Sequence, residues 1–175
     1  MTGPIRVAIV TVSDGVASGN RTDLGGPACE KALADSGIAH EVVSRETVAD
    51  EPKQIARIVR TRSDSEEVDV VVLTGGTGLS PRDRTPEAVR EVIDFEAPGL
   101  AEKMRAETGR DFAAAYLSRQ VAGVRGHALV LALPGSPRGA GDCLRAVAEL
   151  LPHAVSLARG EKPDHPRPES EDGAA

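Results

Sequence analysis

The chain has 175 residues, enough for one ordinary domain with a sizeable core. Hydrophobic residues make up 40% of the chain and aromatic residues only 2%, so the core is expected to consist of Val, Leu, Ile and Ala, as in helices packed on a parallel sheet. The formal net charge of −6 argues against a general role in binding nucleic acid.

The first half of the chain predicts two strands and two helices in alternation. Residues 6–12 form a nearly continuous apolar run, as expected of a strand buried on both faces. A helical pattern then ends at Gly37, which suits a C-terminal cap. Residues 40–48 are interpreted as a second strand, and Asp50 is expected to cap the helix that follows.

The second half continues the alternation. Thr85 is expected to be the N-cap of a helix that has Pro86 in its first turn. A long amphipathic helix is predicted beyond Leu133, in spite of Pro152. The elements expected in this half are strands at 68–73 and 127–133, helices from 85, at 98–108 and at 137–158, and an antiparallel edge strand that 121–124 could add.

The alternation of strands and helices predicts an α/β fold, a three-layer α/β/α sandwich around a mainly parallel sheet. Residues 1–160 are expected to form a single domain. Residues 161–175 are acidic, contain Pro163, Pro166 and Pro168, and predict a disordered tail.

Two further patterns narrow the class of protein. Cys29 and Cys143 are far apart in sequence and form no CxxC pair, so neither a zinc site nor a disulfide framework is predicted. No segment approaches the ~20 apolar residues of a membrane span, and the first residues lack the apolar region of a signal peptide. The protein is expected to be soluble and cytoplasmic, with no nucleic-acid or membrane partner.

Polar or glycine-rich turns follow four of the predicted strands. Ligands of such sheets bind at the carboxyl ends of the strands, so these turns should lie together at one edge. The four sets are Ser13-Asp14-Gly15, Asp50, Thr74-Gly75-Gly76-Thr77-Gly78 and Pro134-Gly135-Ser136.

The glycine turn at 75–78 can present backbone N–H groups to an anion, because glycine allows positive φ and close approach of a ligand. It matches neither a Walker loop nor GxGxxG, and a merely structural tight turn remains the alternative. Asp83, a few residues on, could hold Mg²⁺ beside a phosphate, or could be an ordinary surface or helix-capping carboxylate. The local cations proposed to attract an anion are Arg82, Arg119, Arg125 and Arg138.

The segment TGGTGxxPRDxTPEA at 74–88 resembles the signature of the molybdopterin-binding domain of the Mog/MoaB family of molybdenum cofactor biosynthesis. The resemblance extends in order from about residue 5 to residue 160. Its other segments are TVSD at 11–14, DxGGP at 23–27, VxDE at 48–51, EAPGL at 96–100, LSR at 117–119, GVRG at 123–126 and LPGxP at 133–137.

The resemblance implies a three-layer α/β fold, a homotrimer, and binding of molybdopterin at the strand ends. In catalytic members, Mg²⁺ and ATP are used to transfer AMP to the terminal phosphate of molybdopterin, with release of pyrophosphate. The product then passes to the molybdate-inserting enzyme. A lone domain of this length resembles the adenylylating member, a nucleotidyltransferase.

Carried over by motif, the resemblance assigns Asp50 and Asp83 to catalysis and to the metal. Phosphate and nucleotide are assigned to Thr74, Gly75, Gly76, Thr77, Gly78 and Asp14, with the Thr77 hydroxyl as an added donor. Molybdopterin is assigned to Ser13, Ser118, Arg119, Pro134, Gly135 and Ser136.

Departures from the family pattern affect the pterin side more than the carboxylates: Ser136 replaces a frequent Asn or Gln, and His127 stands where some relatives have Ser. Arg84 stands where many have an apolar residue. Two other functions remain open, a MoaB-like protein that binds molybdopterin with little or no transferase activity, and a generic flavodoxin-like nucleotide binder. The scarcity of aromatic residues argues against flavin stacking.

Overall fold

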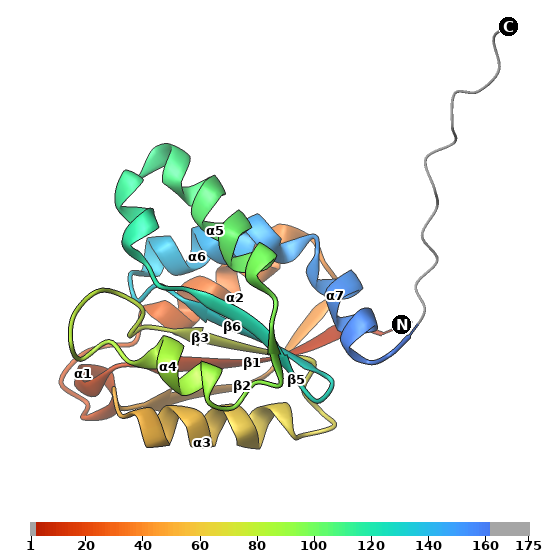
Figure 1. Cartoon of the computed structure of the whole chain (residues 1–175), viewed down its shortest axis with the longest axis horizontal. Coiled ribbons are helices and arrows are strands. Elements are labelled where there is room, and N and C mark those ends of the chain that lie inside the picture. Colours follow the sequence, from red (N-terminus) through yellow and green to blue (C-terminus); the bar gives the residue numbers. More distant parts are fainter. Residues whose placement is uncertain (1–2, 162–175) are drawn as a thin grey trace, which may run out of the picture.

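The computed structural model describes residues 3–161. Within them, six strands form one sheet in the order β2-β1-β3-β6-β5-β4 (Figure 1). Strands β2, β1, β3 and β6 are parallel, whereas β5 and β4 run antiparallel to their neighbours. The strands are β1 (Ile5–Val12), β2 (His40–Val48), β3 (Val70–Thr74), β4 (Phe95–Glu96), β5 (Val121–Arg125) and β6 (Ala128–Leu133).

Helices cover both faces of this sheet and complete the three expected layers (Figure 1). The helices are α1 (Asp14–Ala17), α2 (Gly25–Ser36), α3 (Pro52–Ser63), α4 (Thr85–Arg90), α5 (Pro98–Asp111), the short 3-10 helix η1 (Ala113–Leu117), α6 (Pro137–Ala148) and α7 (Leu151–Ala158). The predicted fold class is therefore confirmed.

The core consists of two apolar clusters, one on each face. Alternate residues of the central strands face opposite sides, so Val70 and Val72 of β3 pack under α2, α5, α6 and α7, while Val71 and Leu73 pack over α3 and α4. All five residues of β3 are buried, because helices cover both faces of this strand.

The antiparallel strand predicted at 121–124 exists as β5, but it is not the edge of the sheet. The two-residue strand β4 pairs with its outer side, through Phe95 opposite Val124. Phe95 and Glu96 are both exposed, so no alternation of apolar and polar residues marks this strand in the sequence.

The single long helix predicted over 137–158 is wrong. Helix α6 ends at Ala148, the N–H of Leu150 bonds to the carbonyl three residues earlier, and α7 begins at Leu151. Pro152 has no N–H to continue a helix and its ring collides with the preceding turn, whereas it is tolerated in the first turn of a new one.

Two predicted helix caps are also wrong. The N-cap of α3 is Glu51, and the N-cap of α4 is Arg84; neither caps through its side chain. Asp50 lies one residue before the α3 cap, and Thr85 is already the first residue of α4. Neither the Asp50 nor the Thr85 side chain therefore caps a helix in the way that the sequence had suggested.

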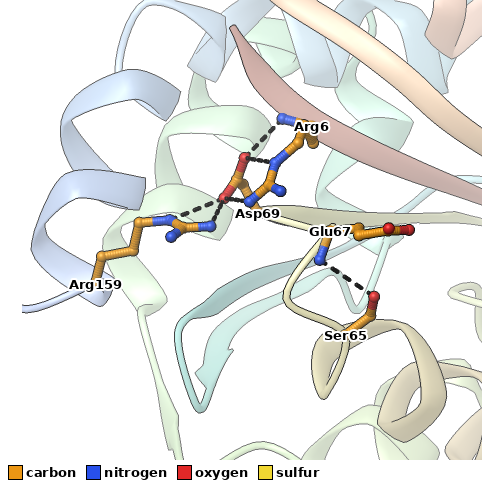
Figure 2. Close-up of polar contacts among 5 residues, drawn as sticks. All are labelled: Arg6, Ser65, Glu67, Asp69 and Arg159. Carbon is orange, nitrogen blue, oxygen red and sulfur yellow. Dashed lines mark hydrogen bonds and ion pairs between the residues drawn. The ribbon is translucent and has the colours of Figure 1, made fainter. Parts of the chain in front are cut away.

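A buried ion cluster lies at the amino ends of the parallel strands, opposite the edge at which the glycine turn emerges. Asp69, 1% exposed, accepts the backbone N–H of Arg6 at 2.8 Å and bonds from its guanidinium at 3.1 Å (Figure 2). Arg159, just after α7, reaches the same carboxylate, with Nε 2.9 Å from Oδ1. Burial raises the pKa of Asp69, but the bonds from the two arginines outweigh burial and hold it below its ordinary value.

Residues 3–161 contain no helix that combines the length and the apolar character needed to cross a membrane. The predicted tail lies outside the described residues apart from Glu161. This residue still contacts the body, because its carboxylate accepts the hydroxyl of Ser156 at 2.8 Å.

Candidate active site

The four parallel strands end in register, so the residues that follow them reach one edge of the sheet. Thr11 pairs with Thr74, and Thr74 pairs with Leu133. β2 ends beside β1, with Val48 opposite Val12. All four turns singled out in the sequence therefore emerge at the same edge.

Asp14 and Asp50 are linked at this edge by two reciprocal hydrogen bonds. The N–H of Asp14 donates to Oδ2 of Asp50, and the N–H of Asp50 donates to Oδ1 of Asp14, both at 2.9 Å. Arg82 forms an ion pair with the second oxygen of Asp14. The two backbone donors and this cation offset the repulsion that two neighbouring carboxylates would otherwise suffer.

The glycine turn presents several unpaired backbone donors. Gly75 and Gly76 have φ of 117° and 63°, values that side chains rarely allow. The N–H of Gly75 is used inside the fold, where it donates to the carbonyl of Leu133 at 3.1 Å. In the described part of the chain, the N–H groups of Gly76, Thr77 and Gly78 have no acceptor. These three, rather than all four, are available to an anion.

Two carboxylates flank this turn. A Cβ placed on Gly76 would lie 3.2 Å from Oδ1 of Asp50, and one on Gly78 would lie 2.7 Å from Oδ2 of Asp83. No three His, Cys, Asp or Glu side chains within residues 3–161 are grouped closely enough to form a metal site by themselves. The donor set therefore fits Mg²⁺, which uses one or two carboxylates together with substrate phosphates, better than an ion that needs a full cage of protein ligands.

The threonines of the turn point into the protein. Thr74 donates its hydroxyl to the carbonyl of Pro134 at 2.7 Å, and the hydroxyls of Thr77 and Ser118 share a bond of 2.9 Å. Both threonines are buried, with exposures of 1% and 3%. The Thr77 hydroxyl, expected to serve as an anion donor, is thus used to hold the turn against the segment before β5.

The residues assigned to the pterin side do not all lie in one place. Ser118, Pro134 and Ser136 line one cavity of about 980 Å³, bounded by α5, η1 and α6. Gly135 packs against the glycine turn, since a Cβ there would lie 3.2 Å from the Cα of Gly75. Ser13 does not line this cavity, and its hydroxyl caps α1.

The four arginines proposed to attract an anion also differ in position. Arg82 borders the Asp14–Asp50 pair, and Arg138 is 83% exposed beside the cavity. The side chain of Arg119 is directed at the loop after the glycine turn. Arg125 is wrong as a candidate, because β5 is antiparallel and its end lies at the opposite edge, where Arg125 pairs with Asp64.

His127 lies in the turn of the same hairpin, two residues after Arg125, and is at that far edge too. This residue, which departs from the family pattern, therefore lies away from the cavity that Ser118, Pro134 and Ser136 line.

Thr85 borders the candidate site, and sequence reasoning missed it. The residue is fully buried, its hydroxyl has no partner among the described residues, and a Cβ on Gly76 would overlap that hydroxyl oxygen. The oxygen thus borders the same space beside Gly76 as Asp50 does. The sequence did contain a signal, because Thr85 lies within the family signature, but its type suggested only a helix cap.

The edge as a whole has the character of an α/β anion site: unpaired N–H donors, flanking carboxylates and an adjoining cavity. A family model described as a probable molybdopterin binding domain matches residues 8–153. The chain therefore belongs to this family of molybdopterin-binding domains.

Named relatives agree with this assignment. The molybdopterin adenylyltransferase of Helicobacter pylori (strain J99) is 36% identical over 156 residues, which cover 89% of each chain. The enzyme of the same name from Escherichia coli K12 is 35% identical over 145 residues, covering 83% of this chain and 74% of that one. The crystal structure of the molybdopterin biosynthesis enzyme MoaB from Thermus thermophilus is 51% identical and superposes with a TM-score of 0.83, covering 90% of this chain and 98% of that one.

Proposed function

We propose that the chain is a molybdopterin adenylyltransferase, in which Mg²⁺ and ATP serve to transfer AMP to the terminal phosphate of molybdopterin. The observation that carries the proposal is the pair of carboxylates, Asp50 and Asp83, on either side of three unpaired N–H groups. The names of the relatives that match most of the chain support it.

Adenylyl transfer joins two anionic groups, so the protein must position them and offset their charge. A terminal phosphate oxygen of molybdopterin attacks the α-phosphorus of ATP, the bond from that phosphorus to the bridging oxygen breaks, and pyrophosphate leaves. The N–H groups of Gly76, Thr77 and Gly78 are suited to hold phosphate oxygens near the reacting atoms, because backbone donors need no reorganisation.

Mg²⁺ would be held by Asp50 and Asp83 and would neutralise charge on the phosphates. Asp14 orients Asp50, because each of the two accepts the backbone N–H of the other. Arg82, paired with Asp14, places a cation beside the Asp14–Asp50 pair.

The pterin side of molybdopterin is assigned to the cavity of about 980 Å³ lined by Ser118, Pro134 and Ser136. A cavity of this size suits a ligand as large as a pterin with its side ring. It adjoins the glycine turn through the bond between Ser118 and Thr77, so the pterin and the phosphates would lie at opposite ends of one ligand.

We further propose that the protein acts in the cytoplasm as a homotrimer and passes its product to the molybdate-inserting enzyme. These proposals rest on the resemblance of the whole chain to the family. Sedimentation of the purified protein tests the homotrimer. We expect a mass of about three chains, and a monomer at micromolar concentration would contradict the proposal.

The activity is tested with purified protein, molybdopterin, ATP and Mg²⁺, by measuring adenylylated product and pyrophosphate. A protein that binds molybdopterin but never consumes ATP would instead be a binding protein. This second candidate is favoured by one observation, the 51% identity to a structure named MoaB rather than Mog.

Replacing Asp83 by Asn keeps the shape of the side chain but removes a charge from the proposed metal site. We expect kcat for adenylyl transfer to fall by roughly two powers of ten or more, as for the loss of one electrostatic catalytic group. Molybdopterin affinity should hold or rise slightly, because a carboxylate repels an anionic ligand. The measurements are initial rates and equilibrium binding.

The matched control is Asp35→Asn, which removes an exposed carboxylate paired with Lys31 on α2. This variant should keep the turnover of the wild type. Full turnover by Asp83→Asn would rule out the assigned role of Asp83.

A further inference from the structure

Arg119 lies in the segment before β5, yet its bonds extend to the loop that follows the glycine turn. Its backbone N–H donates to the carbonyl of Thr77 at 2.7 Å, and its Nε donates to the carbonyl of Gly78 at 2.8 Å. Its terminal nitrogens bond to the carbonyl of Asp83 and to the carboxylate of Glu87. All three guanidinium nitrogens therefore already have protein partners.

These bonds hold both ends of one loop. Gly78 and Asp83 bracket residues 79–82. The planar guanidinium of Arg119 bonds to two carbonyls and a carboxylate at once, which a lysine ammonium could not do with the same geometry. Within the loop, Ser80 and Asp83 also bond to each other: the N–H of Asp83 donates to the carbonyl of Ser80 at 2.9 Å, and the N–H of Ser80 donates to Oδ2 of Asp83 at 3.3 Å. In the described structure, the one long-range polar contact made by a side chain of residues 79–82 is the ion pair of Arg82 with Asp14.

Glu87 completes the arrangement from α4. Burial raises the pKa of Glu87, but the bond from Arg119 and the charges of Arg119 and Arg84 outweigh burial, and its pKa lies below the ordinary value. The carboxylate is therefore charged at neutral pH and fixes one arm of the guanidinium while the other two nitrogens hold the loop.

We propose that Arg119, fastened by Glu87, is a positioning residue that sets the loop from Gly78 to Asp83 and so places the Asp83 carboxylate beside the glycine turn. Arg119 acts through this loop and does not bind molybdopterin. The proposal deepens the transferase function proposed above and rests on it for its kinetic test.

The kinetic test is a double-mutant cycle between Arg119 and Asp83. Arg119→Gln should lower kcat roughly 10- to 100-fold, as expected when a catalytic group is misplaced by about 1 Å, with KM for either substrate nearly unchanged. In an Asp83→Asn background, Arg119→Gln should lower kcat less than about 2-fold further, because the group it positions has already been disabled. Losses that multiply, or a rise in KM for molybdopterin with kcat intact, would overturn the proposal in favour of direct substrate contact.

Two further variants sharpen the cycle. Arg119→Lys should not restore turnover, because one ammonium group cannot span the three acceptors, whereas Glu87→Gln should cost less than Arg119→Gln because both carbonyl bonds remain. The matched control is Arg90→Gln, which removes a cation of α4 that is paired with Glu96 and partly exposed. This control should retain full turnover.

Hydrogen exchange gives a readout that does not depend on turnover. The amides of Ser80, Arg82 and Asp83 are hydrogen-bonded within the loop, so release of the loop should be visible there. Arg119→Gln and Arg119→Lys should speed exchange at these amides at least about tenfold and leave exchange in β1 and β3 unchanged. Unchanged exchange at these three amides would refute the proposed positioning role of Arg119 even if turnover fell. If the wild-type protein had no turnover, the proposed transferase function would be wrong. Hydrogen exchange would still test whether Arg119 holds the loop.

Discussion

Gly76 is required by two separate constraints on one residue. Its φ of 63° lies in the left-handed region, and a Cβ would overlap the hydroxyl oxygen of Thr85 and crowd Oδ1 of Asp50. Gly37 supplies a natural comparison, because its φ of 73° is similar but no atom lies within 4 Å of its added Cβ. The two glycines separate the cost of backbone strain from the cost of collision.

We predict that Gly37→Ala costs about 1 kcal/mol in the free energy of unfolding, the price of a left-handed alanine. Gly76→Ala should cost at least ~1 kcal/mol more, in the range seen for overpacked sites, because Thr85 has to move as well. Urea unfolding of both variants measures the difference. Equal losses would mean that the collision is relieved without cost.

At the same scale, the sequence identified the residue types of the site better than their contacts. Asp14, Asp50 and Asp83 were predicted to lie at the edge of the glycine turn. Asp50 and Asp83 do border the turn, and Asp14 is bonded to Asp50, because parallel strands bring their ends together. Thr85 and Asp50 were expected to cap helices because their side chains suit that role. Capping depends on the backbone angles at the helix start, which residue type alone does not determine.

The end of helix α7 is attached to the sheet through a single carboxylate, that of Asp69. Arg159 follows α7 directly, and its bond to Asp69 ties the end of this helix to the amino ends of β1 and β3 (Figure 2). Asp69 is almost fully buried while both arginines are partly exposed. Loss of the carboxylate would leave two cations without their shared partner.

We predict that Asp69→Asn lowers the free energy of unfolding by roughly 2–4 kcal/mol, as when one partner of a buried ion cluster is removed. Adenylyl transfer at a temperature where the variant is folded should be unchanged, because the cluster lies at the far edge of the sheet. Denaturant unfolding and initial rates are the measurements, with Asp35→Asn as the exposed control. A loss no larger than that of the control would show that α7 is held by its apolar face alone.

The same carboxylate should make stability depend on pH. The pKa of Asp69 is lower in the folded protein than its ordinary value of 3.8, so its contribution is complete above that value. As the pH falls below it, the unfolded chain takes up the proton first, and the contribution disappears once the pH passes below the folded pKa. The difference in Tm between wild type and Asp69→Asn should therefore be full at neutral pH and shrink in acid. A difference that stayed constant down to pH 2 would contradict the assigned cause.

Among the elements, the buried strands were predicted well and the short ones were not. The apolar runs of β1, β3 and β6 are direct consequences of burial on both faces, and these strands lie within a few residues of their predicted bounds. β4 and η1 were missed, since two exposed residues and a five-residue 3-10 turn carry no periodicity. Pro152 indicated a break in the helix, but the helical periodicity on both sides of it favoured one continuous helix.

For the whole molecule, the sheet separates two tasks. The edge at the carboxyl ends gathers unpaired donors and carboxylates, and the opposite edge holds the Asp69 cluster and the turn of the β5–β6 hairpin. The layers could be predicted from the alternation of strands and helices. The contacts of Arg119 could not, because no local pattern records which loop a side chain reaches when 41 residues separate it from Gly78.

The long sequence separation between Arg119 and Gly78 also affects the order in which parts of the protein are expected to fold. In the folded protein, Ser118 and Arg119 meet the glycine turn where β5 pairs with β6 and β6 pairs with β3, and we expect this contact to form after those strands have joined. Closing so long a stretch costs entropy that local helices do not have to overcome. In refolding from urea, recovery of molybdopterin binding should therefore lag behind recovery of the helical circular dichroism signal. The ligand edge would be the last part of the molecule to mature, so a nascent or partly unfolded chain could not capture its ligand prematurely.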